Sequence, residues 1–510
     1  MEGTTLTRPV SPNGVPTPAT ASRDRGASLA RIAFALLCVG FLIGFFVFPT
    51  YPVYDSYYSL LWGRDLLHGH LPTFEGFRYP TEHPLSIVAG AVLSLFGQVG
   101  DRVWVLLILG TFLALVAGVY RLGRLAATPL VGALAAALLL TRFDYAFLAA
   151  RGYVDIPYMA LVVWAAALEA TRRRRGTPVF VLLAAAGLLR PEAWFLAALY
   201  WCWMAWRATW AERIRYALLA AAGPVLWCAV DATVTGDPLF SLHYTSSSAE
   251  DLGRQKPLSQ LPAAVPTFFE DLVKLPVLLA SLAGIVLGAL ITPRRIVMPL
   301  VLVLAGLGTF AALAVAGASV IERYLAVSAL ALMVFAALAV GGWTMLAPSR
   351  LRTAWMLVAA GVVVFGVVFQ VTHLNLSRFD NELRFRGQAH DDLTAVLKDP
   401  KVQAGLRCGP LTGPNHKIVP DSRWIAGLGE GKVLARAWID RVQATPSRYS
   451  AGERAKAASA DKGVAIVVTS RFAIFKHAWT DDSDDPLIQV PPQGFTRVKT
   501  SRFYAAYVHC

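Results

Sequence analysis

Long apolar runs separated by short polar loops dominate the chain from Leu29 to about Val371. A helix needs roughly 20 predominantly apolar residues to cross the hydrocarbon core of a bilayer. The pattern therefore predicts an α-helical polytopic membrane bundle. We expect about eleven spans, at residues 29–48, 101–120, 126–141, 154–171, 177–190, 193–206, 216–234, 273–291, 296–317, 324–346 and 353–372.

Arginine clusters fall in every second loop of this arrangement. They comprise Arg8, Arg23, Arg25 and Arg31 before the first span, then Arg121 and Arg124, Arg172 to Arg175, Arg207, Arg213 and Arg215, Arg294 and Arg295, and Arg350 and Arg352. Short loops rich in Lys and Arg stay on the cytoplasmic side. The N-terminus is thus predicted inside, and an odd number of spans places residues 373–510 outside.

Three stretches of the membrane part depart from the span pattern. Residues 1–28 are rich in Pro, Ser, Thr and Gly, which predicts a disordered cytoplasmic tail. Leu85 to Gly97 is apolar but too short to span, so within the outer loop 49–100 we expect a short helix resting in the membrane interface. The Pro, Ser and Gly content of the outer loop 235–271 predicts irregular structure.

The last part of the chain, residues 373–510, has a higher charge density and no long apolar run. Asp391 to Leu397 is typical of a helix, whereas Lys432–Arg436, Gly463–Thr469 and Phe503–Val508 are typical of strands. We predict one small soluble α/β domain outside the cytoplasm. Cys408 and Cys510 both fall in it, and in an oxidising compartment they could form a disulfide.

Composition agrees with a membrane protein, since 56% of residues are hydrophobic, 16% are charged and mean hydropathy is +0.51. The net charge of +14 would suggest nucleic-acid binding in a soluble protein. Here the arginines lie in short loops, so we expect contacts with membrane lipids and no nucleic-acid partner. Gly427–Lys432 lacks the spacing of a phosphate-binding loop, so no nucleotide cofactor is expected.

Ionisable groups gather on the predicted outer side, close to the ends of spans. They are Asp55, Asp65, Glu75, Glu82, Arg142, Asp144, Arg151, Asp155, Arg190, Glu192, Asp231, Asp237, His243, Lys274, Glu322 and Arg323. Charges at membrane depth are costly and mark function by default. We expect these groups to line a cavity at one face of the bundle. A cavity of this kind suits glycosyl transfer from a lipid phosphate, because a carboxylate can take the proton of the attacking hydroxyl and cations can stabilise the leaving phosphate.

Two carboxylates are the leading candidates for catalysis. Asp55 directly follows the first span and precedes Tyr57–Leu67, an amphipathic stretch that we expect to lie flat on the membrane. Asp155 stands at the start of the fourth span, before Pro157. For each of them a helix cap is an equally good interpretation.

Cations and possible metal ligands lie nearby. Arg323, Arg190, Arg78 and Lys274 are the candidates for binding the donor phosphate. Arg190 has the alternative of a structural ion pair with Glu192. Glu82 and His243 could hold a divalent metal ion. The alternative for Glu82 is a hydrogen-bonded turn with its neighbour His83.

A series of short motifs in order resembles a known superfamily across residues 29–345. The motifs are Tyr54-Asp55, the run Tyr79–Leu85 with a short helix ending at Leu95–Gly97, Leu122–Arg124, Arg151–Pro157, Leu189–Glu192, and Gly236–Leu239 with His243. This series resembles the GT-C integral-membrane glycosyltransferases. The likeness is greatest to the branch of protein O-mannosyltransferases and bacterial lipid A aminoarabinose transferases.

The resemblance implies that Asp55 is the catalytic carboxylate and Asp155 the second acidic position. It places Glu82 and His243 where the aminoarabinose branch has metal ligands, and it implies a polyprenyl-phosphate sugar donor. Asp55-Ser56 departs from the Asp-Glu pair of protein mannosyltransferases, so a glycan, lipid or protein acceptor all stay open. The Arg-, Ala- and Gly-rich composition is typical of a high-GC bacterium, which implies a bacterial plasma membrane and a cell-envelope product.

Two other functions are compatible with a polytopic bundle. A transporter or flippase of lipid-linked sugars predicts internal repeats and broken helices near the bilayer midplane. The sequence shows no repeat, and its charges gather at one face. A non-catalytic scaffold with a glycan-binding outer domain leaves Asp55, Asp155 and Arg323 unexplained. We therefore favour the glycosyltransferase.

Overall fold

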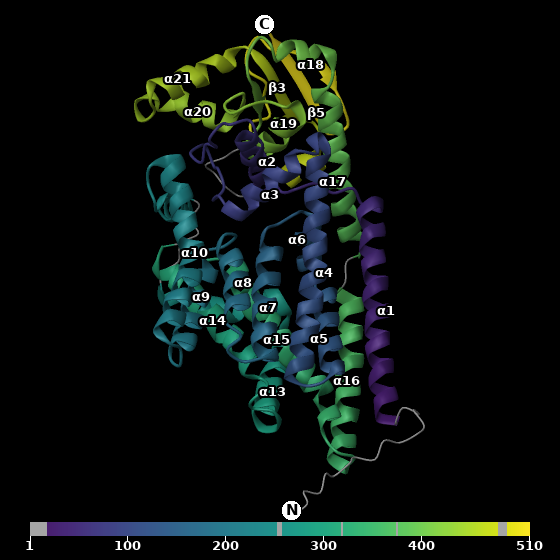
Figure 1. Cartoon of the computed structure of the whole chain (residues 1–510). Coiled ribbons are helices and arrows are strands. Elements are labelled where there is room, and N and C mark those ends of the chain that lie inside the picture. The colour runs from purple at the N-terminus through teal and green to yellow at the C-terminus, as the bar shows by residue number, and fades with distance from the viewer. Residues whose placement is uncertain (1–17, 252–257, 318–319, 374–375, 478–486) are drawn as a thin grey trace, which may run out of the picture. The chain divides into compact units, whose positions relative to one another are not determined.

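The computed structural model describes residues 18–251, 258–317, 320–373, 376–477 and 487–510 (Figure 1). The chain divides into two units, Met1–Gly44 and Phe45–Cys510. The first unit is described from the start of helix α1 (Pro18–Val47). Residues 18–28 form the first part of this helix, with Pro18 in the first turn, where proline is tolerated. The rest of the predicted tail lies outside the described residues.

Every predicted span coincides with a helix, but the helices differ in length. In the second unit they are α4 (Gly100–Ala126), α5 (Pro129–Thr141), α7 (Asp155–Thr171), α8 (Thr177–Gly187), α9 (Glu192–Ala205), α10 (Trp210–Thr235), α13 (Leu275–Ile291), α14 (Val297–Val315), α15 (Ala326–Gly341) and α16 (Arg350–His373). The short helix α6 (Phe143–Ala150) lies between α5 and α7 and matches no predicted span. Among the described residues, six helices are long and apolar enough to cross a membrane, or eight if two bent pairs each count once. The predicted count of eleven is therefore not confirmed.

Helix α15 forms the centre of the bundle. It is buried along almost its whole length and packs against α13, α14 and α5. A helix that is apolar on all sides is stable only when neighbours surround it. Gly284 of α13 lets that helix approach the backbone of α15, because a Cβ there would overlap the carbonyl oxygen of Phe335.

Helices α2 (Tyr54–Leu67) and α3 (Pro84–Ser94) cross in close contact between the bundle and the C-terminal domain (Figure 1). A Cβ on Gly63 would lie 2.1 Å from the nitrogen of Ala91, and one on Gly90 would lie 2.2 Å from the oxygen of Ser59. The sequence-based prediction that Tyr57–Leu67 lies exposed on the membrane is wrong. Its first half is buried, because α3 and α19 (Val419–Ala426) cover it.

The outer loop 235–271 was predicted to be irregular, and this is also wrong. It contains α11 (Phe240–Asp251) and α12 (Leu261–Val273). The carboxylate of Asp237 accepts a hydrogen bond from the backbone of Leu239 at 2.9 Å, just before α11 begins. Pro262 stands in the first turn of α12, where a proline costs no backbone hydrogen bond. Turn-forming residues here mark helix starts.

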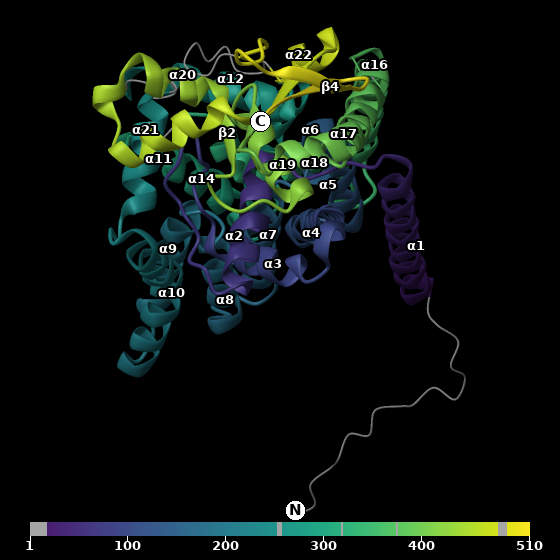
Figure 2. The same cartoon turned by 90° about the horizontal axis from the view of Figure 1, so that it is seen from above.

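The C-terminal domain is the predicted α/β unit, and it caps one end of the bundle (Figures 1 and 2). Its described sheet has the order β2-β1-β3-β5-β4. The strands are β1 (Leu411–Gly413), β2 (Val433–Ala435), β3 (Gly463–Val468), β4 (Thr496–Thr500) and β5 (Tyr504–His509). Strand β1 runs parallel to β2 and β3, and β5 runs antiparallel to β3 and β4. The predicted strands correspond to β2, β3 and β5.

Six helices accompany this sheet, and one disulfide closes it. The helices are α17 (Leu376–Leu397), α18 (Pro400–Gly405), α19, α20 (Arg436–Ala444), α21 (Ala451–Ala458) and α22 (Arg471–His477). Cys408, after α18, is bonded to Cys510 at the end of the chain, with Cα atoms 5.3 Å apart. The sheet and α17 bury a shared apolar core that includes Leu393, Leu411 and Ile466.

Helix α19 fixes this domain on the membrane unit through a buried charge. Arg423 of α19 has 1% of its side chain exposed and lies 2.6 Å from Glu430 and 3.8 Å from Asp65 of α2. The indole of the next residue, Trp424, donates to the carbonyl of Gln98, whose amide donates back to the carbonyl of Trp424 at 3.0 Å. The contact with Asp65 holds α19 against α2, and the contacts with Gln98 hold it against the turn Gly97–Val99 before α4.

We predict that Gly63→Ala destabilises the protein, because the new methyl group would force α2 and α3 apart. Overpacking of this kind costs about 1–3 kcal/mol. The measurement is the thermal unfolding temperature in detergent. The matched control is Gly110→Ala on α4, where an added Cβ would meet no atom within 4 Å apart from the neighbouring backbone of its own helix. Alanine is a better helix former than glycine, so this change should be neutral or stabilising. Equal effects of the two substitutions would contradict the close crossing.

Candidate active site

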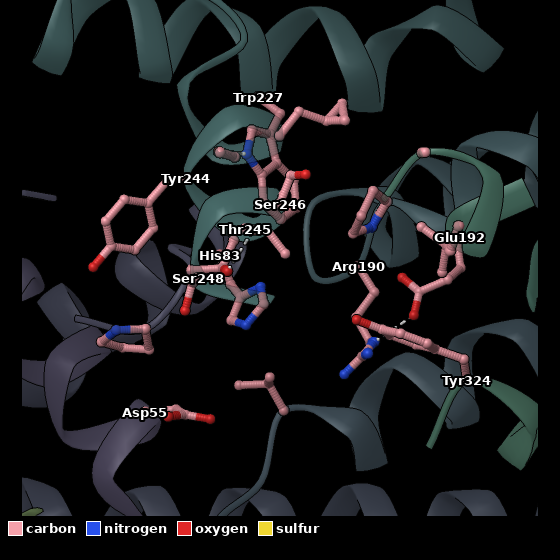
Figure 3. A pocket seen from close by; sticks show the side chains of 18 of the residues that line it. Asp55, His83, Arg190, Glu192, Trp227, Tyr244, Thr245, Ser246, Ser248 and Tyr324 are labelled. Atoms are coloured by element: carbon pink, nitrogen blue, oxygen red, sulfur yellow. Dashed lines mark hydrogen bonds and ion pairs between the residues drawn. The ribbon is translucent and has the colours of Figure 1, made fainter. Parts of the chain in front are cut away.

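A cavity of about 630 Å³ lies where the loops 49–100 and 235–271 meet the ends of several helices. Its walls come from the start of α2, the segment 78–83, the start of α7, the turn 190–192, α10, α11, α14 and residues 321–324. In Figure 3, Asp55 and Arg190 face this space from different sides. The cavity brings together Asp55, Asp155, Arg78, Arg190 and Arg323, five of the residues that the sequence singled out.

Asp55 is held at the start of α2 by contacts of its neighbours. The backbone of Val53 donates to the carbonyl of Arg151 at 2.8 Å, and the hydroxyl of Ser56 donates to the carbonyl of Gly152 at 2.6 Å. Val53 is the N-cap, so the alternative of Asp55 as a helix cap is wrong. Burial raises the pKa of the Asp55 carboxyl, and the charge of Arg323 partly offsets this. A carboxyl of raised pKa beside a cavity suits proton transfer.

Asp155 is shared by two arginines. Its Oδ1 lies 2.5 Å from Nη1 of Arg190, and its Oδ2 lies 3.6 Å from Nη1 of Arg323. Arg190 also pairs with Glu192, its Nε lying 2.9 Å from Oε1. Arg190 is therefore buried between two carboxylates, whereas Arg323 keeps 34% of its side chain exposed. The structure combines the two interpretations of Arg190, because it forms the ion pair and also lines the cavity.

Asp155 therefore does not act as a helix cap either, since Val154 is the N-cap of α7. Its carboxylate is fully engaged with arginines, so it orients the cations of the site. Asp55, which makes no ion pair of this kind among the described contacts, is the better proton acceptor.

The predicted metal pair is not assembled. Glu82 is 1% exposed and contacts the hydroxyl of Ser241, which also lies 2.7 Å from Oδ2 of Asp231. His243 is largely exposed, and its Nδ1 lies 2.7 Å from Asp237. Glu82 and His243 thus belong to two different clusters and do not fit a shared metal ion. No group of three potential metal ligands is present in the described part of the chain.

One hydroxyl proton serves two carboxylates in the Glu82 cluster. The indole of Trp227 donates to the hydroxyl oxygen of Ser241 at 2.7 Å. The hydroxyl itself has one proton to donate, and the oxygens of Glu82 and Asp231 both lie within reach of it. Burial and the neighbouring Asp231 raise the pKa of Glu82 to about 8. The cluster joins the loop before α3 to α10 and α11, and it forms part of the cavity wall.

Of the two other predicted phosphate ligands, Arg78 and Lys274, one lies at the cavity and the other does not. Arg78 lines the cavity, and its carbonyl accepts a hydrogen bond from the hydroxyl of Tyr54. Lys274 does not line it. The lysine stands at the sharp bend between α12 and α13, where it is half exposed and lies 4.0 Å from Asp271. The prediction that Lys274 belongs to this site is therefore wrong, because the bend turns it to the surface.

Other residues also line the cavity, and sequence reasoning missed some of them. His83, which the sequence analysis named beside Glu82, lines it, and burial lowers the pKa of its imidazole to about 3, so the ring is neutral. The aromatic rings of Tyr54, Tyr244 and Tyr324 also line it. His416 comes from the C-terminal domain. No local signal marks His416, since only the packing of the two parts brings it there.

The fold resembles solved structures, although comparisons of the sequence find no match. No family model and no curated protein matches the sequence. Among solved structures, the fold matches ArnT from Cupriavidus metallidurans bound to undecaprenyl phosphate, with 12% identity, a TM-score of 0.51, and coverage of 94% of this chain and 98% of that one. It also matches the Archaeoglobus fulgidus oligosaccharyltransferase tethered with an acceptor peptide, with 12% identity, a TM-score of 0.50, and coverage of 89% and 70%.

The chain has the GT-C fold. The resemblance seen in the motifs of residues 29–345 is thereby confirmed at the level of the fold. The match extends further than those motifs, because coverage of 94% of the chain takes in most of the C-terminal domain as well. At 12% identity the GT-C likeness assigns no role to a residue, so the roles rest on the geometry of the cavity.

We predict that Asp155→Asn destabilises the protein by about 3 kcal/mol, because it removes a charge that compensates the buried Arg190 and the partly exposed Arg323. Thermal unfolding in detergent measures the effect. Asp144→Asn is the matched control, since Asp144 pairs with Arg142 but is 68% exposed, and exposed pairs contribute little. If Asp155→Asn were as harmless as the control, Asp155 would not be the anchor of this site.

Proposed function

We propose that this protein is a glycosyltransferase that moves a sugar from a polyprenyl-phosphate donor to a hydroxyl of a cell-envelope acceptor, on the outer face of a bacterial plasma membrane. The observation that carries the proposal is the meeting of Asp55 with the Arg190–Arg323 pair in one cavity of a GT-C bundle. A proton acceptor and a phosphate-binding group are the two parts that this reaction needs.

The donor phosphate fits the arginine end of the cavity. Arg323 has guanidinium surface left for a ligand, whereas Arg190 supports it through the shared Asp155. Arginine binds phosphate through charge-assisted, often bidentate hydrogen bonds. The structure of ArnT with undecaprenyl phosphate supports a ligand of this class for the fold.

The prenyl chain requires an apolar exit from the same cavity. Ala312 and Leu313 of α14, Ala316 directly after this helix, and Phe195 of α9 line one wall of it. Because these helices belong to the apolar bundle, a chain leaving between them would enter lipid. The wall thus supports a donor anchored in the bilayer.

The reaction follows from these positions. The acceptor oxygen attacks the anomeric carbon, and its bond to that carbon forms as the bond from carbon to phosphate oxygen breaks. Asp55 takes the proton of the acceptor hydroxyl, and the polyprenyl phosphate leaves with the bonding electron pair. Arg323 and Arg190 stabilise the charge that develops on the phosphate.

We predict that Asp55→Asn keeps the fold and lowers transfer by about 100-fold or more, the usual contribution of general base catalysis. The assay presents the purified protein with undecaprenyl-phosphate mannose, glucose, galactose, arabinose and aminoarabinose in turn, and measures release of undecaprenyl phosphate. Asp144→Asn, outside the cavity, should stay active. A well-folded, fully active Asp55→Asn protein would contradict the role of Asp55. Transport of the donor without release would instead indicate a flippase.

We also predict the pH dependence of kcat/KM. Asp55 must be ionised to accept a proton, and burial raises its pKa above the ordinary 3.8. Activity should therefore be low in acid and should rise as pH increases through this elevated value. A profile measured with the donor found above tests this. Activity that falls with increasing pH across the acid range would show that the essential group is an acid.

A further inference from the structure

His416 brings the C-terminal domain into the active-site cavity. Of the cavity-lining residues that the structure describes, it is the one contributed by residues 373–510. Its ring meets that of Tyr54 edge to face, with centroids 5.1 Å apart, and that of Phe77 at 6.4 Å. Tyr54 directly precedes Asp55. His416 therefore contacts the residue that directly precedes the proposed base.

The segment 413–418 that holds His416 follows β1, at the point where the strand order reverses. Strand β1 lies between β2 and β3 and runs parallel to both, so the chain leaves β1 for one side and later returns on the other. Ligands of open α/β sheets bind outside the carboxyl ends of the strands at such a point. The position of His416 in its own domain is therefore that of a binding residue.

The backbone of this segment is fixed by several hydrogen bonds. The carbonyl of Pro414 accepts from the nitrogen of Ile488 at 3.1 Å, and the buried side chain of Asn415 accepts from the nitrogen of Lys417 at 3.2 Å. Beneath it, the guanidinium of Arg436 donates to the carbonyls of Thr412 and Ile466. The imidazole is thus presented on a preorganised support.

The contacts of α2 and α19 set the distance between His416 and Asp55. Residues 416–418 lead directly into α19, just as Tyr54 and Asp55 begin α2. At the other end of the two helices, Arg423 pairs with Asp65. The two helices therefore run side by side with their starts at the cavity.

The chemistry of this end differs from that of the arginine end. Tyr54, Tyr79, Tyr244 and His416 line it with rings that have polar tips. In Figure 3, Tyr244 and Asp55 lie on one side of the cavity, and Arg190 and Tyr324 lie on the other. A sugar has C–H faces that pack on aromatic rings, and a rim of hydroxyls that bonds to phenol and imidazole groups.

We propose that segment 413–418 forms the acceptor subsite, that His416 determines acceptor specificity there, and that the acceptor is a carbohydrate. This inference rests on the proposed glycosyltransferase function. A lipid acceptor would require apolar walls at this end, and a peptide would require backbone partners along an extended groove. Rings with polar tips match neither as well as they match a sugar.

The test uses the full-length protein in detergent and the donor on which the wild type acts. The acceptors are p-nitrophenyl glycosides of mannose, glucose, galactose and arabinose, a peptide that contains Ser and Thr, and phosphatidylglycerol. The variants are His416→Ala, His416→Phe and His416→Leu, the last of which keeps side-chain volume against Tyr54 and Phe77. His509→Ala, in the same domain but outside the cavity, is the matched control.

We expect a glycoside to be the preferred acceptor. His416→Ala and His416→Leu should raise the KM for the glycoside roughly tenfold, which corresponds to the loss of one aromatic contact. His416→Phe keeps an aromatic ring, so its KM should stay close to that of the wild type. Donor hydrolysis without acceptor should stay within about twofold of the wild type, as should both activities of His509→Ala. This split between acceptor KM and donor hydrolysis would not result from a general structural defect.

Several outcomes would overturn the inference. They are an unchanged acceptor KM in folded His416→Leu, an equal loss of donor hydrolysis, and a preference for the peptide or for phosphatidylglycerol. Failure of the proposed function looks different, since the wild type would then consume none of the donors.

Discussion

The carboxylate of Asp155, shared by Arg190 and Arg323, is the constraint on which the cavity depends. It joins three elements that are distant in sequence, namely the start of α7, the turn before α9 and the segment before α15. Buried charges of this kind persist only when each has a partner. The arrangement leaves Arg190 enclosed by two carboxylates and leaves Arg323 partly exposed to the cavity. A permanent internal ion pair thus orients the cation that is available to a ligand.

A second buried charge, Arg423, organises the other half of the site. Its contacts with Asp65 and Glu430 hold α19 against α2, and the ring of Tyr79 is tied to the same Glu430 through its hydroxyl. Since α2 begins with Tyr54 and Asp55, any displacement of the C-terminal domain would also displace the base. The helical bundle and the C-terminal domain therefore act as one structure around the cavity.

Much of this could be predicted from the sequence, because strong local patterns decide it. Long apolar runs located the helices of the bundle, and short segments typical of strands located β2, β3 and β5. Charges near span ends located Asp55, Asp155, Arg190 and Arg323, which the fold gathers in one place. Local patterns failed where tertiary contacts decide. Burial of α2 depends on α3 and α19, and β1 is defined by its pairing with β2 and β3. The pairing of Glu82 with Ser241 and Asp231 also depends on how α10 and α11 pack.

The two ends of the cavity are built from different interactions, so we expect amino-acid substitutions to affect them differently. The arginine end consists of buried ion pairs, where removal of one partner leaves an uncompensated charge. The His416 end consists of partly buried rings, where one ring can replace another at a modest cost. Substitutions should therefore accumulate faster at the second end than at the first. A fold shared at 12% identity therefore assigns no acceptor to this protein. The identity of the acceptor must then be sought in the loop that follows β1.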